Sequence, residues 1–486
     1  MKLTELLSKF KNYKVFNLKD FNVKGISCDS RKIEPNFIFV AIKGSKQDGL
    51  QFIPQAIKKK AKAIILEKFP KYKNKDLTYI KVKNIRRFYA HLCSEFYQNP
   101  SKYLKVVGVT GTNGKTTITY LIENILKNVK KDSLVIGTID YRYKNRIFSS
   151  HNTTPSCEEI QSLLWQAKRE NVEYAIMEVS SHGLSQYRVE GIDFSYAIFT
   201  GLSQDHLDYH RTMNAYFNAK ARLFKMLSKD AFAIINIDDH YAHRLIKLIK
   251  AKIVTYGLSR KADFSASQIH KDINGTDFIL NSPKGKIKIY TPLLGKYNIY
   301  NILASCAFAV LDGIKLSEIR DAQKNFINPP GRLELVWKKD FYVFVDYAHT
   351  PVALKNVILT LREVFKGRLI LVFGCGGNRD RKKRPIMGKI ASDLADFVVV
   401  TSDNPRNEEP QRIIRDILKG IKSKNYKVIP DRKEALLFAL SMAKPKDLIL
   451  VAGKGHERYQ IIKEKIIPFD DRLIIREYLN EPIRDS

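Results

Sequence analysis

Short apolar runs alternate with longer amphipathic segments through most of this 486-residue chain. Runs of this kind fill residues 105–110, 133–139, 174–180, 196–202 and 232–238. Strands that are buried on both faces show such continuous apolar runs, and the amphipathic segments between them indicate crossover helices. The pattern therefore predicts an α/β fold in which helices cover both faces of a parallel sheet.

The alternation starts again after Pro329-Pro330-Gly331, a combination typical of a domain boundary. The apolar runs of this second series fill residues 341–347, 368–374, 396–402 and 447–453. A first unit, with apolar runs at 36–42 and 60–68, comes before Gln98-Asn99-Pro100. The chain length also favours about three domains. We therefore predict three α/β domains, over residues 1–98, 99–330 and 331–486.

The chain carries 84 basic and 50 acidic residues, a formal net charge of +34. This excess favours an anionic partner, either nucleic acid or small anionic substrates. Lysines that simply cover solvated faces are a third explanation. The basic residues are spread along the whole chain without a long basic arm, so the charge leaves all three interpretations open.

The cysteines and the apolar segments bear on the cellular compartment. Five cysteines without a CxxC pair disfavour a disulfide framework or a zinc ribbon. The longest segment without a charged residue, 297–311, is shorter than the ~18–20 residues of a membrane span. The N-terminal segment lacks the continuous apolar core of a secretory signal. We expect a cytoplasmic protein with no integral membrane segment.

The sequence KVVGVTGTNGKTT runs from an apolar strand through a glycine-rich turn into a helix. Gly111 and Gly114 would let backbone N–H groups approach phosphate oxygens without a Cβ in the way. Lys115 would reach the β- and γ-phosphates, Thr116 would give its hydroxyl to Mg²⁺, and the helix N-terminus would add its dipole. Val109 stands where the strict pattern has glycine, so this is a variant loop. The alternative is a glycine turn that caps an ordinary helix.

Carboxylates and imidazoles follow two neighbouring strand-like runs. Glu178 comes at the end of the apolar run in YAIMEVS, where a carboxylate would face the phosphate loop. The stretch SQDHLDYH follows another run and holds Asp205, His206, Asp208 and His210. Imidazole nitrogens at a strand end can ligate a metal ion. The alternative for each histidine is a hydrogen-bonded structural role.

The chain resembles the Mur ligases, because ten motifs occur in the order seen in that family and, together with the CDSR segment near the N-terminus, they run over residues 28–457. They are TGTNGKT, MEVSSHGL, SQDHLDYH, AKARLF, GKYNIYN, GRLE, VDYAHTP, FGCGGNRDRKKRP, TSDNPR and AGKGHE. The resemblance implies three parts: an N-terminal α/β domain that binds a UDP-linked substrate, a central P-loop ATPase-like parallel sheet that binds ATP and metal, and a C-terminal Rossmann-like domain that binds an amino acid.

The resemblance also implies contacts with a UDP-linked muramoyl-dipeptide. The matching residues are Ser30, Arg31, Thr153, Thr154, Ser181, Gln186 and Arg188. Arg188 has the forked donor geometry that suits a carboxylate or a phosphate. Family members usually have glycine where Asn36 stands. Because asparagine tolerates a positive φ better than most residues, we expect the turn at this position to survive.

The nucleotide and metal sites follow from the same resemblance. ATP contacts match Gly111, Thr112, Asn113, Gly114, Lys115, Thr116, Thr117, Asn301, Arg332, Asp346 and His349. The catalytic set is Lys115 with Glu178, His206 and Lys220, and Mg²⁺ ligands match Thr116, Glu178, His206 and Lys220. From the sequence alone Lys220 is a solvated helix lysine. The resemblance instead implies that CO₂ converts it to a carbamate (N6-carboxylysine), an anionic oxygen ligand of the kind that Mg²⁺ prefers.

Residues near the C-terminus match the amino-acid pocket of the family. They are Arg379, Asp403, Asn404, Pro405, Arg406, Gly453 and Glu457. Members that select meso-diaminopimelate carry the DNPR motif, whereas lysine-selecting members typically lack its arginine. Diaminopimelate has a second carboxylate, which arginine can bind through two parallel hydrogen bonds. Glu457 could pair with the distal ammonium.

The implied reaction is the ATP-dependent addition of meso-2,6-diaminopimelate to UDP-MurNAc-L-Ala-D-Glu through an acyl phosphate, a step of peptidoglycan precursor synthesis. The implied partners are these small molecules and no nucleic acid, and we expect a monomer. Three alternatives remain: an L-lysine-adding ligase of the same family, a basic P-loop protein that binds nucleic acid, and a ligase remnant without activity.

Overall fold

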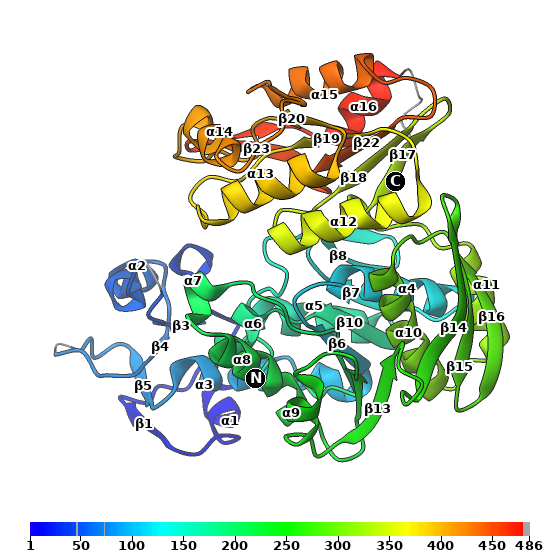
Figure 1. Cartoon of the computed structure of the whole chain (residues 1–486). Coiled ribbons are helices and arrows are strands. Elements are labelled where there is room, and N and C mark those ends of the chain that lie inside the picture. Colours follow the sequence, from blue (N-terminus) through cyan, green and yellow to red (C-terminus); the bar gives the residue numbers. More distant parts are fainter. Residues whose placement is uncertain (45–46, 72, 480–486) are drawn as a thin grey trace. The chain divides into compact units, whose positions relative to one another are not determined.

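The computed structural model describes residues 1–44, 47–71 and 73–479 (Figure 1). The end of the third predicted domain, residues 480–486, lies outside the described residues. The chain divides into two compact units, Met1–Tyr256 and Gly257–Ser486, and each is described by itself. Neither boundary predicted from the sequence, after residue 98 or after residue 330, coincides with this division, and both stay predictions.

The first unit begins with a five-stranded sheet in the order β1-β5-β4-β3-β2. Only β1 runs antiparallel to its neighbour. The strands are β1 (Tyr13–Phe16), β2 (Gly25–Ser27), β3 (Phe37–Val40), β4 (Ala63–Leu66) and β5 (Thr78–Val82), and the helices are α1 (Leu3–Leu7), α2 (Ile53–Lys58) and α3 (Ile85–Phe96). Asn36 has a φ of +67°, which confirms that asparagine keeps the turn before β3.

A second sheet in this unit contains six parallel strands in the order β13-β12-β11-β6-β10-β7. They are β6 (Lys105–Thr110), β7 (Ser133–Ile136), β10 (Tyr174–Glu178), β11 (Tyr196–Phe199), β12 (Phe232–Asn236) and β13 (Lys252–Gly257). The predicted parallel sheet is therefore confirmed. The central strand β6 lies between β10 and β11, so the chain order reverses there, and a crevice at the carboxyl ends of such strands is the usual ligand site.

Helices and a hairpin complete this part of the first unit. The helices are α4 (Lys115–Asn128), α5 (Cys157–Arg169), α6 (Ser181–Ser185), α7 (Leu207–His210), α8 (Met213–Lys225) and α9 (Ala242–Ile246). Two antiparallel strands, β8 (Asp140–Tyr143) and β9 (Arg146–Ser149), extend the sheet beyond β7. The sequence analysis did not predict this hairpin.

The second unit opens with an antiparallel meander that the sequence analysis also missed. It consists of β14 (Phe264–Asp272), β15 (Gly275–Ser282) and β16 (Gly285–Thr291). Helices α10 (Lys296–Leu311) and α11 (Leu316–Lys324) follow and pack on these strands. Nearly all of α10 is buried, which explains why residues 297–311 carry no charge.

The rest of the second unit is a sheet in the order β17-β18-β22-β19-β20-β21, parallel except at β17. One face packs on α12, α13 and α14, and the other on α15 and α16 (Figure 1). The strands are β17 (Glu334–Lys338), β18 (Tyr342–Asp346), β19 (Leu369–Phe373), β20 (Phe397–Val400), β21 (Tyr426–Val428) and β22 (Leu448–Ala452). The helices are α12 (Pro351–Val364), α13 (Lys383–Leu394), α14 (Pro410–Leu418), α15 (Arg432–Ser441) and α16 (Asp471–Tyr478), and a hairpin of β23 (Tyr459–Ile462) and β24 (Lys465–Pro468) precedes α16. Within the described ranges, no helix is long and apolar enough to cross a membrane.

A fully buried ion pair joins the first residues of α15 and α16. Arg432 donates to both carboxylate oxygens of Asp471, at 2.8 and 2.7 Å. It also donates to Ser402 O at 3.2 Å and Ala452 O at 3.1 Å, just after β20 and at the end of β22. The pair therefore supports the two loops that leave these strands.

Replacing Asp471 by alanine is expected to destabilise the second unit by about 3 kcal/mol, because it leaves the Arg432 cation buried without its carboxylate. We expect a loss of stability at the low end of the range usual for a broken buried ion pair, because Arg432 still donates to the carbonyl oxygens of Ser402 and Ala452. Urea denaturation of the variant measures it. The matched control is Asp393→Ala, which breaks an exposed ion pair with Lys389 and should cost about 0.5 kcal/mol or less. Equal losses in the two variants would contradict the expectation.

Candidate active site

The glycine-rich loop between β6 and α4 has the backbone that only glycines adopt readily. Gly111 has a φ of +151° and Gly114 a φ of +86°. A Cβ built on Gly111 would lie 1.8 Å from the hydroxyl of Thr200, so the loop packs too closely for any side chain there. Lys115 Nζ donates to the backbone oxygens of Gly111 at 3.0 Å and Thr112 at 2.8 Å, so the lysine folds back over the loop.

Glu178, the last residue of β10, lies beside the first turn of α4. Its Oε1 atom accepts a hydrogen bond from the Thr116 hydroxyl at 2.9 Å. Thr138, in the loop after β7, donates to the same carboxylate through its backbone N–H at 2.8 Å and its hydroxyl at 3.0 Å. The Glu178 side chain is buried. A hydroxyl and a fixed carboxylate are thus together at the carboxyl edge of the sheet.

Lys220 reaches the same loop from α8. The residue is only 2% exposed, and Nζ donates to Gly111 O at 2.7 Å. Nζ also lies 4.8 Å from the centre of the Tyr216 ring. The solvated interpretation of Lys220 is therefore wrong. Burial lowers the pKa of this ammonium well below its usual value, and the nearby Lys115 cation lowers it further.

The histidines of SQDHLDYH gather beside α7. His206 has a φ of +53° and its Nε2 atom lies 3.5 Å from Asp205 Oδ2. Its ring packs against those of His182 and Tyr216, with centroids 4.8 and 6.1 Å apart. Burial lowers the pKa of His206, Asp205 opposes this shift, and the Lys115 and Lys220 cations add to it. Among the described residues, no three side chains of the His, Cys, Asp and Glu types are placed to hold a metal ion, and no hydrogen bond joins His206 to Glu178.

The residues matched to the muramoyl-dipeptide lie next to Glu178. The Thr154 hydroxyl donates to Glu178 O at 2.8 Å, and the Thr153 hydroxyl is 3.0 Å from that of Thr138. Arg188 donates to Thr154 O at 2.6 Å and to Gln186 Oε1 at 3.2 and 2.9 Å. The Ser181 hydroxyl is buried in the first turn of α6. The structure thus brings these five residues to the side of the loop where Glu178 lies.

Ser30 and Arg31 lie elsewhere in the first unit, in a short turn after β2. Ser30 donates to Gln55 Oε1 at 2.7 Å. Arg31 pairs with Asp29 at 2.8 Å and its side chain is 81% exposed. Among the described residues, no hydrogen bond joins these two residues to the group around Glu178.

Four predicted nucleotide contacts belong to the second unit. Asn301 is buried in α10 and donates to Asn298 Oδ1 at 2.9 Å. Asp346, at the end of β18, accepts from Leu333 N, and burial raises its pKa to about 6. Arg332 lies 4.9 Å from the centre of the Tyr347 ring, and the His349 ring packs on that tyrosine at 4.6 Å. Arg332 and His349 therefore lie against Tyr347, which follows Asp346 in the chain. Among the described residues, no hydrogen bond joins Asn301 to this group.

The seven residues matched to the amino-acid pocket come together in the second unit. They lie on the loops after β19, β20 and β22: Arg379, Asp403, Asn404, Pro405, Arg406, Gly453 and Glu457. Asn404 donates to Glu457 Oε2 at 2.7 Å, and a Cβ on Gly453 would lie 2.6 Å from Asp403 Oδ2. A Cβ built on Gly376 would face both Arg379 and Arg406, so the two guanidinium-bearing side chains flank one glycine.

Arg406 has an unusual backbone, with a φ of +52°. The hairpin β23–β24 holds it there, because Arg406 N donates to Ile461 O at 3.0 Å and Lys463 N donates to Arg406 O at 2.7 Å. Its Nη1 atom donates to Gly377 O at 3.0 Å and lies 3.5 Å from Asn404 O. Within the described residues, neither the Nε nor the Nη2 atom of Arg406 forms a hydrogen bond. These two atoms form the edge of the guanidinium group that can bind a carboxylate through two parallel hydrogen bonds.

Sequence reasoning missed three residues that support these groups. Thr138 could have been found because it lies near the end of an apolar run, as Glu178 does. Lys454 lies inside the AGKGHE motif but received no role. Arg384 is fully buried, pairs with Glu408 at 2.9 Å and Asp416 at 3.1 Å, and donates to Gly376 O at 3.3 Å. Because Arg384 stands in a run of basic residues, the sequence gave no sign that its side chain is buried.

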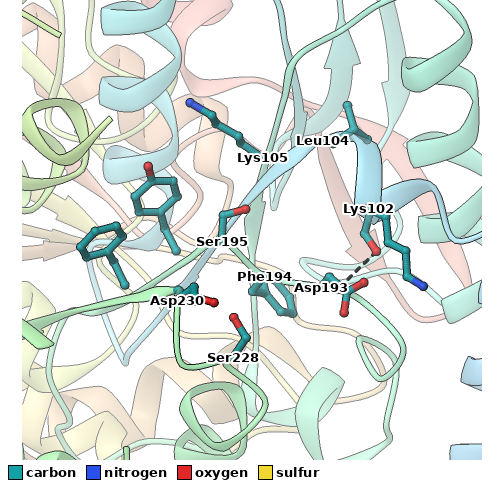
Figure 2. A pocket seen from close by; sticks show the side chains of 12 residues that line it. Lys102, Leu104, Lys105, Asp193, Phe194, Ser195, Ser228 and Asp230 are labelled. Carbon is teal, nitrogen blue, oxygen red and sulfur yellow. Dashed lines mark hydrogen bonds between the residues drawn. The ribbon is translucent and has the colours of Figure 1, made fainter. Parts of the chain in front are cut away.

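A cavity of about 430 Å³ lies at the opposite, amino end of β6 (Figure 2). Lys102, Lys105, Asp193 and Asp230 line it together with small and aromatic side chains. None of the predicted site residues lines this cavity. The polar groups that converge on the loop after β6 thus belong to the other end of the strand.

The chain belongs to the Mur ligase family. Three family models match it: the Mur ligase family catalytic domain over residues 22–97, the Mur ligase middle domain over 109–309, and the Mur ligase glutamate ligase domain over 331–455. The mixed α/β fold with three Mur ligase domains agrees with the sequence-based expectation.

Curated relatives are similar over the full length. The UDP-N-acetylmuramoyl-L-alanyl-D-glutamate–2,6-diaminopimelate ligase of Clostridium botulinum is 44% identical over 483 residues, 98% of this chain and 99% of that protein. The ligase of the same name from Fusobacterium nucleatum is 44% identical over 475 residues, 96% of each. A solved structure with this name is 36% identical, covers 94% of this chain and 95% of its own, and gives a TM-score of 0.69.

Proposed function

We propose that this chain is an ATP-dependent ligase that joins meso-2,6-diaminopimelate to UDP-MurNAc-L-Ala-D-Glu, a step in peptidoglycan precursor synthesis. The observation that carries the proposal is the pocket in which Arg379 and Arg406 flank Gly376 while Glu457 lies nearby on the loop after β22. Full-length relatives that carry the name of this activity support it. The L-lysine-adding alternative would leave the two arginines without a second carboxylate to bind.

The residues around the loop after β6 fit Mg²⁺, which prefers oxygen ligands. The Thr116 hydroxyl and the Glu178 carboxylate are 2.9 Å apart and would hold the ion, with His206 as a further ligand. When bound, Mg²⁺ neutralises the charge that develops on the transferred phosphoryl group. The glycine loop, Lys115 and the N-terminus of α4 would bind the phosphates of ATP.

Lys220 fits conversion to a carbamate. Reaction with CO₂ needs a neutral amine, and burial lowers the pKa of Lys220 far enough to favour that form. The ammonium form would place a third cation beside Mg²⁺ and Lys115. The carbamate would present an anionic oxygen at the same edge of the sheet.

The reaction proceeds in two steps. The free D-Glu carboxylate attacks the γ-phosphorus of ATP, the bond to ADP breaks, and an acyl phosphate forms. The amine of diaminopimelate then attacks the acyl carbon, gives up a proton, and phosphate leaves as the amide forms. Lys115 and the loop N–H groups stabilise the charge on the transferred group. Thr153, Thr154 and Arg188 orient the muramoyl-dipeptide, and Ser30 and Arg31 bind its UDP end.

Selection of the amino acid depends on charge. Arg379 and Arg406 bind the carboxylate that lysine lacks, and Glu457 pairs with an ammonium. Asn301, Arg332, Asp346 and His349 are proposed to bind the nucleoside part of ATP. We further propose that the enzyme acts in the cytoplasm as a monomer, on small molecules and without nucleic acid.

Phosphate release tests the function. The full chain is mixed with UDP-MurNAc-L-Ala-D-Glu, ATP and Mg²⁺, with bicarbonate present, and receives meso-diaminopimelate or L-lysine in parallel; the product mass is confirmed. We expect turnover with diaminopimelate only. Turnover with lysine alone would support the ligase activity but refute the assignment of the pocket to diaminopimelate. No turnover with either amino acid would refute the proposed reaction.

A further inference from the structure

Lys454, in the loop after β22, has a fully buried side chain that no step of the proposed reaction uses. Its Nζ atom donates to Asn404 Oδ1 at 3.2 Å, to Glu457 Oε2 at 3.2 Å and to Tyr459 O at 2.5 Å. A lysine ammonium has three N–H donors. All three are therefore used, and they join the loop after β20 to the loop after β22 and to β23.

Asn404 closes the same network from the DNPR motif. Its Nδ2 atom donates to Glu457 Oε2 at 2.7 Å, and its Oδ1 atom accepts from Ile461 N at 2.9 Å as well as from Lys454. The residue is 2% exposed. Asn404 thus forms part of the wall of the pocket and acts through Glu457.

The network orients the carboxylate of Glu457. Both donors, Lys454 and Asn404, reach its Oε2 atom. Among the described residues, no hydrogen bond reaches its Oε1 atom. The Glu457 side chain is 13% exposed, so this second oxygen can accept a hydrogen bond from a ligand that enters the pocket.

The electrostatic setting agrees with this geometry. Burial raises the pKa of Glu457, and the neighbouring Asp403 carboxylate adds to the increase, whereas Lys454 and the hydrogen bond from Asn404 oppose it. Lys454 therefore favours the ionised carboxylate. Ionisation matters because a neutral carboxylic acid attracts an ammonium far less than a carboxylate does.

We propose that Lys454 is a positioning residue of the amino-acid pocket: it ties Glu457 to Asn404 and so presents Glu457 Oε1 to the distal ammonium of diaminopimelate. This inference rests on the proposed function, because it needs that ligand in this pocket. Lys454 does not touch the reacting atoms, and it acts on substrate selection through Glu457.

The first test replaces Lys454 by methionine, which keeps most of the length of the side chain and removes the charge and the three N–H donors. We expect the KM for diaminopimelate to rise ~10- to 50-fold, while the KM values for ATP and UDP-MurNAc-L-Ala-D-Glu change by less than ~2-fold. The matched control is Lys433→Met, an exposed lysine on α15, which should leave all three values unchanged.

A double-mutant cycle separates positioning from general damage to the fold. If Lys454 acts through Glu457, then adding Lys454→Met to Glu457→Gln should raise the KM for diaminopimelate by less than a further ~2-fold, since contacting residues couple strongly. If Lys454 only stabilised the fold, the increases in the KM for diaminopimelate caused by the two substitutions would multiply in the double variant. Lys454→Gln keeps an uncharged NH₂ group with two N–H donors, and it should give an intermediate increase in KM.

The outcomes distinguish this inference from the proposed function. Suppose that the wild type turns over diaminopimelate. The proposed role of Lys454 alone is then overturned if Lys454→Met leaves the KM for diaminopimelate unchanged, or if the increases in KM caused by Lys454→Met and Glu457→Gln multiply in the double variant. No wild-type turnover with diaminopimelate overturns both. If Lys454→Met does not yield folded protein, Lys454→Gln takes its place in the same comparison, and an unchanged KM there overturns the role of Lys454.

Discussion

Replacing Lys220 by methionine is expected to lower turnover ~10³-fold, the loss that follows removal of one preorganised charged group at a reacting centre. The buried amine lies 2.7 Å from Gly111 O, within the loop that we propose binds the ATP phosphates. As a carbamate it would supply an anionic oxygen for Mg²⁺, which methionine cannot. Phosphate release at saturating substrates measures the effect.

Lys220→Arg distinguishes a carbamate from a simple cation. Arginine keeps a positive charge and hydrogen-bond donors, but it does not form the carbamate, so we expect it to be as inactive as methionine. Wild-type activity should rise with added bicarbonate, and neither variant should respond. The matched control is Lys225→Met, an exposed lysine on the same helix. Arginine that retains most of the activity would contradict the carbamate.

Apolar periodicity and glycine spacing predicted the elements that position this site. The parallel sheet around β6, the turn at Gly111 and Gly114, and the placement of Glu178 at a strand end all follow from local patterns. They do so because strand edges, tight turns and phosphate binding each need particular residue types at short spacing. The structure places Thr116 against Glu178 across 62 positions of sequence, as the strand-end argument required.

The burial of Lys220 was predictable in principle. Tyr216, Phe217, Ala221 and Phe224 recur at helical spacing around it and are all buried, so Lys220 lies on the apolar stripe of α8. The charge of Lys220 instead suggested an exposed side chain. A lysine within an apolar stripe is instead a signal of function, because burying its charge is costly unless the group is neutral or paired.

Other features could not be predicted from local patterns. The meander β14–β16 has many charged residues on its exposed face, which obscured the alternation of a half-buried sheet. The left-handed conformation of Arg406 depends on the hairpin β23–β24, more than 50 residues later in the chain. Lys454 meets Asn404 and Glu457 only through tertiary contacts. Each of these depends on long-range pairing that one sequence does not display.

The conformation of Arg406 determines how its replacement should be designed. Its positive φ strains any residue except glycine, so alanine keeps the backbone cost and removes the side chain beyond Cβ, including the guanidinium group. Arg406 Nη1 already donates to Gly377 O at 3.0 Å, which fixes the plane of the group before the ligand arrives. The Nε and Nη2 edge would then bind a carboxylate with little loss of side-chain freedom.

Arg406→Ala is therefore expected to lower kcat/KM for diaminopimelate ~10²- to 10³-fold, the effect of removing one partner of a buried hydrogen-bonded charge pair. The KM for ATP should stay the same. Arg406→Lys should recover little, because an ammonium cannot form the fork. Arg412→Ala, an exposed arginine on α14, is the matched control.

L-Lysine, offered to the same variants, provides the reference for this loss. It lacks the carboxylate that we propose Arg406 binds, so kcat/KM for lysine should be low in the wild type and nearly unaffected by Arg406→Ala. The preference for diaminopimelate over lysine should then fall by the same factor as kcat/KM for diaminopimelate. If both amino acids lose equally, Arg406 supports the loop as a whole, and the second carboxylate must be bound by another group, of which Arg379 is the nearest candidate.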